Sequence, residues 1–169
     1  MSFYEAAPRA IQNKTELFAQ EPARVAIRAI MAGVYLGIMT AFALATAELL
    51  EGYAPGWGKY AFAAIFASTL YIIIVLQGEL ATGNMMFMTY GAIHKKVNPW
   101  SGFLLVLYVT IFNFIGAIVI SWLISRTTMG QAVDVDGFLH TLLVGKLAKP
   151  SSTLFVEAIL ANMVVNIAF

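Results

Sequence analysis

A short polar stretch interrupts an apolar part of the chain and restricts the folds available to it. Residues 77–84 (Gln-Gly-Glu-Leu-Ala-Thr-Gly-Asn) follow seventeen residues without a charge, 60–76, and precede nine mostly apolar ones, 85–93. A helix needs about 20 apolar residues to cross a hydrocarbon core of roughly 30 Å, so neither piece comfortably spans it alone. Together they predict one membrane span broken by a loop. Irregular backbone at membrane depth requires surrounding protein or a watery cavity, and it indicates a transport path.

The composition supports a membrane protein. The chain is 60% hydrophobic and 11% charged, whereas soluble domains carry about 25% charged residues. A net charge of +1 gives no basic surface for nucleic acid. The absence of cysteine excludes disulfides and thiolate metal sites. We therefore expect an all-α integral membrane protein that crosses the cell membrane several times, with no metal, cofactor or nucleic-acid partner.

The apolar runs predict one membrane domain over residues 1–169. Its expected elements are an amphipathic surface helix within 1–25, a first span at 26–50, a broken second span at 60–93, a third span at 101–124 and a fourth span at 153–169. The fourth apolar run continues to the last residue with no cap or polar flank. We therefore expect the protein to extend beyond residue 169.

Basic residues in the short flanks predict the orientation. Four of them precede or open the first span, and Lys95 and Lys96 follow the second, whereas the first connection has only Lys59. Three basic residues between the third and fourth spans weaken this asymmetry. A cytoplasmic N-terminus is favoured if the broken element crosses once. A re-entrant hairpin would instead place Lys95 and Lys96 outside.

Two motifs resemble those of a known family. Residues 79–84 (Glu-Leu-Ala-Thr-Gly-Asn) are similar to the broken-helix signature of the formate/nitrite transporter family, in which a Glu-Leu pair precedes a threonine. Residues 158–165 (Ala-Ile-Leu-Ala-Asn-Met-Val-Val) resemble that family's Gly-Ile-Leu-Cys-Asn signature in the fourth helix. The order of the predicted elements agrees as well. The resemblance covers essentially the whole chain and matches the N-terminal portion of a family protomer.

The resemblance implies an aquaporin-like fold with six spans per protomer, in two inverted halves, and a pore through each protomer of a homopentamer. About four spans would be present in this chain. The family's central pore histidine belongs to a fifth, also broken, helix that lies outside this sequence. His94 and His140 fall in predicted loops and are not assigned that role.

The resemblance also implies pore residues near the break. Thr82 matches the family threonine that faces the pore histidine, and its hydroxyl can donate to an anion; helix capping is the alternative. Leu80 and Ala81 match positions that narrow the cytoplasmic side of the pore. Ala81 is smaller than is common there, which would loosen selectivity. Glu79 is expected to accept backbone N–H groups freed by the loop.

Further pore residues are implied elsewhere in the chain. Asn162 matches an asparagine near the pore centre, and Val165, one turn later, matches an apolar constriction residue. Phe66 matches an aromatic at the outer constriction, although lipid contact or packing would also suit a phenylalanine. Lys146, sixteen residues before Asn162, matches a lysine that attracts anions in the outer vestibule. Lys149 is the other candidate for this vestibule lysine. Alternatively, both lysines are ordinary solvent-exposed residues of a loop.

These features predict a passive, pH-sensitive channel or transporter for small monovalent anions rather than an enzyme. Formate is the first candidate, with nitrite or hydrosulfide as alternatives. The resemblance implies proton-coupled or neutral-acid permeation, in which the family's pore histidine would give a proton to the anion and let it cross as the neutral acid. A subunit of a membrane redox enzyme would need histidine ligands on its spans. An aquaporin-type channel for neutral solutes would need paired Asn-Pro-Ala loops, and the chain has only Asn98-Pro99, at an interface. Asn113 and Asn166 are expected to form interhelical hydrogen bonds.

Overall fold

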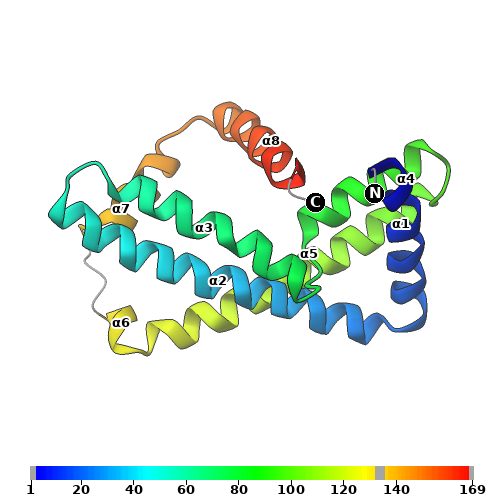
Figure 1. Cartoon of the computed structure of the whole chain (residues 1–169), viewed down its shortest axis with the longest axis horizontal. Coiled ribbons are helices and arrows are strands. Elements are labelled where there is room, and N and C mark those ends of the chain that lie inside the picture. The colour runs from blue at the N-terminus through cyan, green and yellow to red at the C-terminus, as the bar shows by residue number, and fades with distance from the viewer. Residues whose placement is uncertain (1–2, 132–135, 168–169) are drawn as a thin grey trace.

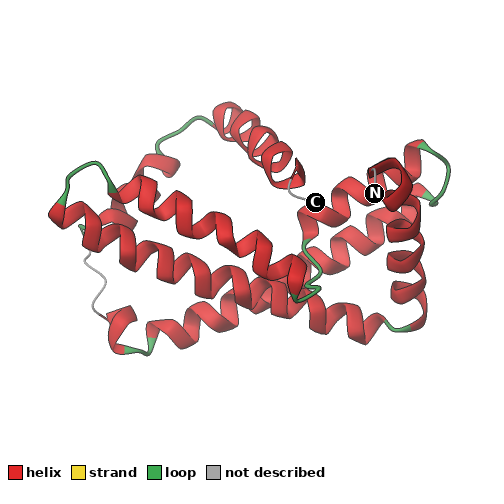
Figure 2. Cartoon of the chain, viewed as in Figure 1, coloured by secondary structure: helices red, strands yellow, loops and turns green. Residues whose placement is uncertain are grey.

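The structure, a computed structural model, describes residues 3–131 and 136–167, and every regular element in these ranges is an α-helix (Figures 1 and 2). The helices are α1 (Phe3–Gln20), α2 (Pro22–Tyr53), α3 (Gly58–Val75), α4 (Ala81–Ile93), α5 (Pro99–Ser125), α6 (Thr128–Gln131), α7 (Phe138–Leu147) and α8 (Ser151–Ile167). The prediction of an all-α chain is confirmed for this part of the protein.

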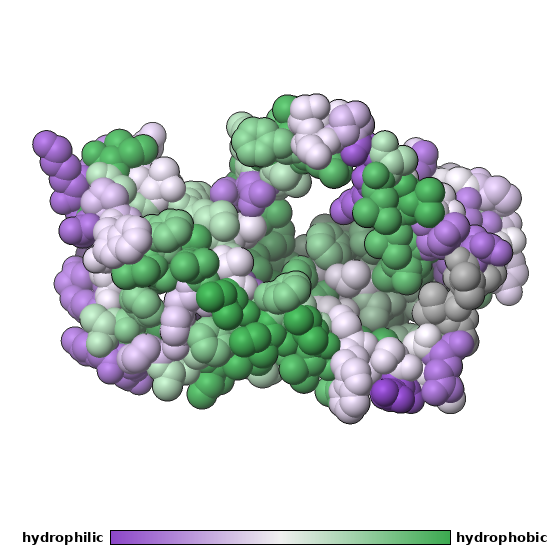
Figure 3. Space-filling model, turned by 180° about the vertical axis from the view of Figure 1, so that it is seen from behind, coloured by the Kyte–Doolittle hydropathy of each residue, from purple (hydrophilic) through white to green (hydrophobic). Residues whose placement is uncertain are grey.

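Several helices have the length and composition of membrane spans. By these criteria α2, α3 and α5 can each cross a membrane. The pair α7 and α8, bent by 116°, passes the same criteria together, which gives up to four spans. Large apolar side chains such as Phe114 and Trp122 are exposed on α5. Apolar residues also cover the middle of the face in Figure 3, with hydrophilic residues toward its two ends. These features fit a multi-pass membrane protein.

The helices α2 and α5 cross near the middle of the molecule (Figure 1), and glycines allow their close approach. A Cβ added to Gly33 would lie 2.1 Å from the backbone oxygen of Asn113. A Cβ added to Gly116 would lie 2.1 Å from the backbone oxygen of Ile30. Small residues at a helix crossing permit this kind of backbone contact in membrane proteins. The crossing therefore depends on the absence of a side chain at both positions.

The two halves of the broken element lie on different sides of this crossing. The helix α3 packs along α2, and α4 packs along α5. In Figure 1, α4 continues away from α3 toward the opposite end of the molecule. Gly58, at the start of α3, lies against Ala47, whereas Gly78, just after its end, lies against Ala32, so α3 runs antiparallel to α2. The break therefore carries the chain onward past the crossing.

The buried core lies where α1, α2, α4 and α5 meet. It contains six buried apolar residues: Ile11, Val25, Ala29, Met88, Leu105 and Val109. We expected the apolar face of α1 to meet the membrane surface, but Ala7 and Ile11 on this face are 0% and 2% exposed. The face packs on α2, α4 and α5 instead. An amphipathic pattern identifies an apolar face without identifying what covers it.

The segment between the third and fourth predicted spans contains helices where the sequence suggested a polar loop. It includes α6 and α7, and His140 therefore lies on a helix. The backbone N–H of Phe138, at the start of α7, donates to the Glu48 carboxylate of α2 at 2.6 Å. This contact satisfies one of the backbone donors that a helix N-terminus leaves unpaired. A distant acidic residue thus supports a helix that the local pattern did not predict.

Both halves of the broken element end in the same backbone motif. Gln77 and Lys95 follow the ends of α3 and α4 with φ angles of 53° and 56°. The next residue in each case donates back into the helix: Gly78 to the Ile73 oxygen at 2.8 Å, and Lys96 to the Gly91 oxygen at 2.7 Å. This is the Schellman arrangement, in which glycine usually occupies the left-handed position.

We expect Lys95→Gly to stabilise the protein by about 0.5–1 kcal/mol. A left-handed conformation costs a non-glycine residue roughly 1–2 kcal/mol, and glycine removes this cost. Glycine also loses more conformational entropy on folding, which offsets part of the stabilisation. Thermal unfolding of the purified protein in detergent would measure the change. Lys96→Gly is the matched control, because Lys96 does not have a positive φ and should gain nothing. Equal effects of the two substitutions would contradict the prediction.

Candidate functional site

The candidate site is the backbone break between α3 and α4. The helix α3 ends at Val75 and α4 begins at Ala81. The N-cap residue of α4 is Leu80, with φ −96° and ψ 133°, and no side chain caps the helix locally. We expected Thr82 to lie within the break, but it lies in the first turn of α4. The break is therefore shorter than the polar stretch 77–84 suggested.

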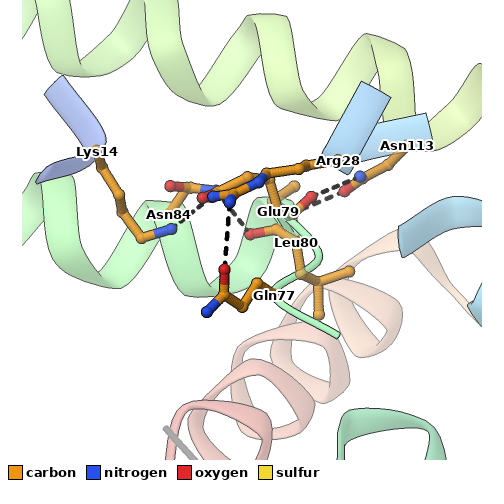
Figure 4. Close-up of polar contacts among 8 residues, drawn as sticks. Lys14, Arg28, Gln77, Glu79, Leu80, Asn84 and Asn113 are labelled. Atoms are coloured by element: carbon orange, nitrogen blue, oxygen red, sulfur yellow. Dashed lines mark hydrogen bonds and ion pairs between the residues drawn. The ribbon is translucent and has the colours of Figure 1, made fainter. Parts of the chain in front are cut away.

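Two contacts from α2 hold the first part of the break (Figure 4). The backbone N–H of Glu79 donates to the backbone oxygen of Arg28 at 3.2 Å. The Arg28 guanidinium also donates to the Gln77 side-chain oxygen at 3.2 Å. One arginine of the first span therefore contacts the break through both its backbone and its side chain.

A third helix contacts the second part of the break through Asn113 of α5. Its amide nitrogen donates to the backbone oxygens of Ala29, at 2.7 Å, and Glu79, at 2.8 Å. Its amide oxygen accepts the backbone N–H of Ala81 at 2.9 Å. The expected interhelical hydrogen bonds of Asn113 are confirmed. This one side chain joins α5, α2 and the start of α4.

The Glu79 carboxylate is buried, with the residue 7% exposed, and it pairs with side chains rather than backbone N–H groups. Lys14 of α1 forms an ion pair with it, and the Asn84 amide donates to it at 2.9 Å. The expectation that Glu79 accepts freed backbone N–H groups is therefore wrong. Sequence reasoning missed Lys14, although a carboxylate inside a membrane domain usually requires a partner.

The Thr82 hydroxyl has an unusual environment. Its oxygen is buried, and it has no hydrogen-bond partner among the described residues. The alternative role in capping α4 is not observed, because the cap position belongs to Leu80. Most buried polar atoms in proteins are satisfied, so an unsatisfied one requires an explanation. Among the described residues, the side-chain oxygens of Thr69, Asn84 and Asn166 share this state, and of these Asn84 lies with Thr82 in the first turn of α4.

The two candidate residues on α8 share one face. Along α8 the partly buried residues are Asn162, Val165 and Asn166, whereas the others that the structure describes there are exposed. Spacings of three and four residues place these side chains together. The helix α8 packs against α4, so this face and Thr82 belong to adjoining helices. The Asn162 amide donates to the Ala158 oxygen of its own helix at 2.8 Å.

The remaining candidates lie farther from the break. Phe66 is partly buried on α3 and stacks on Phe62 with ring centroids 5.5 Å apart. Ten residues separate it from Leu76, which corresponds to about 15 Å of helix. Lys146 lies in the last turn of α7 and forms no ion pair among the described residues. Its rival Lys149 pairs with Glu157 at 2.7 Å.

A separate cavity of about 670 Å³ lies where α2 and α5 diverge. Small and apolar residues of the two helices line it, including Gly37, Ala41 and Ala117. None of the pore residues predicted from the sequence lines this cavity. Within the described ranges, no group of three or more histidine, aspartate or glutamate side chains is arranged to hold a metal ion. The candidate site is therefore the break with its facing helix.

Together, the apolar spans and a broken helix fixed by neighbouring helices define a helical membrane protein with an interrupted span. The formate/nitrite transporter family profile matches residues 2–169. The chain belongs to this family, as the two sequence motifs indicated.

Individual relatives agree with the family assignment. The transporter YwcJ of Bacillus subtilis is 32% identical over 159 residues, covering 93% of this chain and 61% of YwcJ. The nitrite transporter NirC of Escherichia coli is 26% identical over 153 residues, covering 90% of this chain and 56% of NirC. The formate channel BtFdhC of Bacillus thuringiensis is 29% identical over 107 residues, covering 62% and 40%. The chain thus spans about three fifths or less of the length of these relatives.

Proposed function

We propose that the protein carries small monovalent anions across the cell membrane, with formate as the first candidate and nitrite or hydrosulfide as alternatives. Family membership supports this proposal, as do the names of relatives that carry nitrite and formate. The observation that carries it for this chain is the buried, unpartnered Thr82 hydroxyl beside the break. Thr69 on α3 also has an unpartnered hydroxyl among the described residues, so it is the place of Thr82 in the first turn of α4, next to the break, that favours a polar solute path.

The proposed path runs along the seam between α4 and α8. Leu80 and Ala81 would narrow it on the cytoplasmic side, and Val165 would narrow it on the other. Between them, Thr82 and Asn162 would supply hydrogen-bonding groups to the solute. The packing of α8 on α4 and the partial burial of Asn162 and Val165 support this arrangement.

Two residues would act outside this seam. Phe66 would form the outer constriction, and Lys146 would concentrate anions at the pore mouth. A cation at the mouth raises the local concentration of anions. Among the described residues Lys146 forms no ion pair, whereas Lys149 pairs with Glu157, and this difference favours Lys146 for the role.

The chemistry favours passage of the neutral acid. A bare anion would lose its hydration in an apolar constriction, at a large cost in free energy. A proton taken up from the solution on the entry side converts the weak-acid anion to its neutral acid, and the neutral acid can then cross the apolar constriction. Transport is therefore expected to increase as the pH on the entry side falls.

We also propose the family assembly for the full-length protein: a six-span, aquaporin-like protomer in a homopentamer, with the N-terminus in the cytoplasm. The path of the broken element supports the orientation, because α4 continues past the crossing (Figure 1) and the re-entrant alternative would fold it back on α3. Lys95 and Lys96 would then lie on the same side as the N-terminal basic residues.

We expect Thr82→Val to reduce formate entry about tenfold, because valine keeps the shape but removes the hydrogen bond offered to the solute. Stopped-flow light scattering of liposomes containing the full-length protein would measure entry of formate, nitrite, hydrosulfide and glycerol. Thr110→Val is the control, since the Thr110 hydroxyl bonds the Val106 oxygen of its own helix. Glycerol entry without any anion entry would instead favour a channel for neutral solutes.

A further inference from the structure

The hydrogen bonds of Asn113 bracket a single residue of the break. Glu79 offers its backbone oxygen to the Asn113 amide nitrogen, and Ala81 donates its backbone N–H to the amide oxygen. Leu80 lies between these two anchors, and Figure 4 shows its side chain projecting away from them. One side chain from α5 therefore fixes the backbone on both sides of Leu80.

Asn113 also provides the cap that α4 lacks in its own sequence. The N-cap residue Leu80 has an apolar side chain and no side-chain cap hydrogen bond, although the first backbone N–H groups of a helix need acceptors. The Asn113 oxygen accepts the first of these, from Ala81, at 2.9 Å. The starting point of α4 is therefore set by a residue of another helix.

The crossing of α2 and α5 holds Asn113 in place. Its amide nitrogen also donates to the Ala29 oxygen of α2 at 2.7 Å. A Cβ added to Gly33 of α2 would lie 2.1 Å from the backbone oxygen of Asn113. The backbone at Asn113 is therefore in close contact with α2. The amide is thus held between two helices, and small movements of the break would break its hydrogen bonds.

We propose that Asn113 is a positioning residue that sets the width of the constriction at Leu80 and Ala81, and through it the size of solute that passes. This inference rests on the proposed function. The role requires a donor and an acceptor on one short side chain, which asparagine provides. Leucine has a similar shape and provides neither, and aspartate keeps the acceptor but loses the donors.

Size discrimination tests this role in the full-length protein. In the stopped-flow assay we expect Asn113→Leu to lower the ratio of formate to acetate entry rates about tenfold. A well-fitted site discriminates between two solutes that differ by one methyl group by about this factor. Asn113→Asp should lower it in the same direction. Thr110→Val, on the same helix, should keep the wild-type ratio. An unchanged ratio in a folded, monodisperse Asn113 variant would overturn the proposal. Failure of both variants to fold would also overturn it, because Asn113 would then be a folding residue.

A second readout separates this inference from the proposed function. Residues 1–169 contain no cysteine, so Leu80→Cys introduces the one thiol of this part of the protein, and the full-length protein with Leu80 intact gives the background rate of modification. A small thiol reagent should modify it several-fold faster when Asn113→Leu is present than when Asn113 is intact. If the wild-type protein carried no anion, the proposed function would fail, but this rate difference would still support the positioning role. Equal modification rates would overturn it.

Discussion

Lys14→Met is expected to lower the free energy of unfolding by about 3 kcal/mol. The substitution keeps a chain of similar length but removes the cation paired with Glu79. The Glu79 side chain is 9% exposed, so its charge would remain buried with only the Asn84 amide as a partner. Removing one partner of a buried ion pair typically costs 3–5 kcal/mol. Unfolding of the purified protein by increasing denaturant in detergent would measure the loss.

An ion pair at the protein surface provides the control. Lys149 and Glu157 pair at 2.7 Å with side chains 40% and 47% exposed. An exposed pair is worth at most about 1 kcal/mol, so Lys149→Met should have little effect. The double variant Lys14→Met with Glu79→Gln should recover much of the loss, because no buried charge remains. If the two single lysine variants were equally stable, the Lys14–Glu79 pair would not hold α1 to the break.

Gly33→Ala is expected to destabilise the protein by a similar amount, about 3 kcal/mol. The added Cβ would meet the backbone oxygen of Asn113 at 2.1 Å and the backbone nitrogen of Ala117 at 3.0 Å. Backbone atoms cannot move aside as a flexible side chain can, so α2 and α5 must separate. Overpacking of this kind usually costs 1–3 kcal/mol, and the separation would also strain the bond from Asn113 to Ala29.

Gly52→Ala separates this steric effect from the general effect of adding a methyl group to a helix. Gly52 belongs to the same helix, and nothing lies within 4 Å of a Cβ added there. Alanine is a better helix former than glycine by about 1 kcal/mol, so Gly52→Ala should be neutral or slightly stabilising. Denaturant unfolding of both variants would give the comparison. A Gly33→Ala protein as stable as Gly52→Ala would show that the crossing is looser than described.

The helical membrane class followed from residue type alone. Exposing the long uncharged runs to water would be unfavourable, so most of the chain is expected in lipid. There, the backbone groups of a helix are paired within that helix. The polar stretch 77–84 predicted a broken helix for a similar reason, since glycine, glutamine and glutamate interrupt an apolar run at this depth. The structure has the break between Val75 and Ala81. The helix α4 starts within the polar stretch because Asn113 accepts the Ala81 N–H.

The partners of the polar residues could not be predicted in this way. Sequence analysis identified Glu79 and Asn113 as polar groups that needed partners, but it did not identify Lys14 or the backbone of Ala29. Lys14 lies 65 residues from Glu79 in the chain, and no local period links them. The same limit applies to the apolar face of α1, whose residues were recognised but whose covering helices were not.

The sequence by itself thus determined the helical class of this membrane protein, the family and the approximate place of the break. These properties depend on hydrophobicity, helix length and short motifs, which are local along the chain. The tertiary structure decided where α4 begins and which charge neutralises Glu79, and it left the buried hydroxyls of Thr69 and Thr82 without a partner among the described residues. The physical reason is that a buried polar group is stabilised by whichever group the packing brings within hydrogen-bond distance. At the break, that packing is set by the glycine-mediated crossing of α2 and α5.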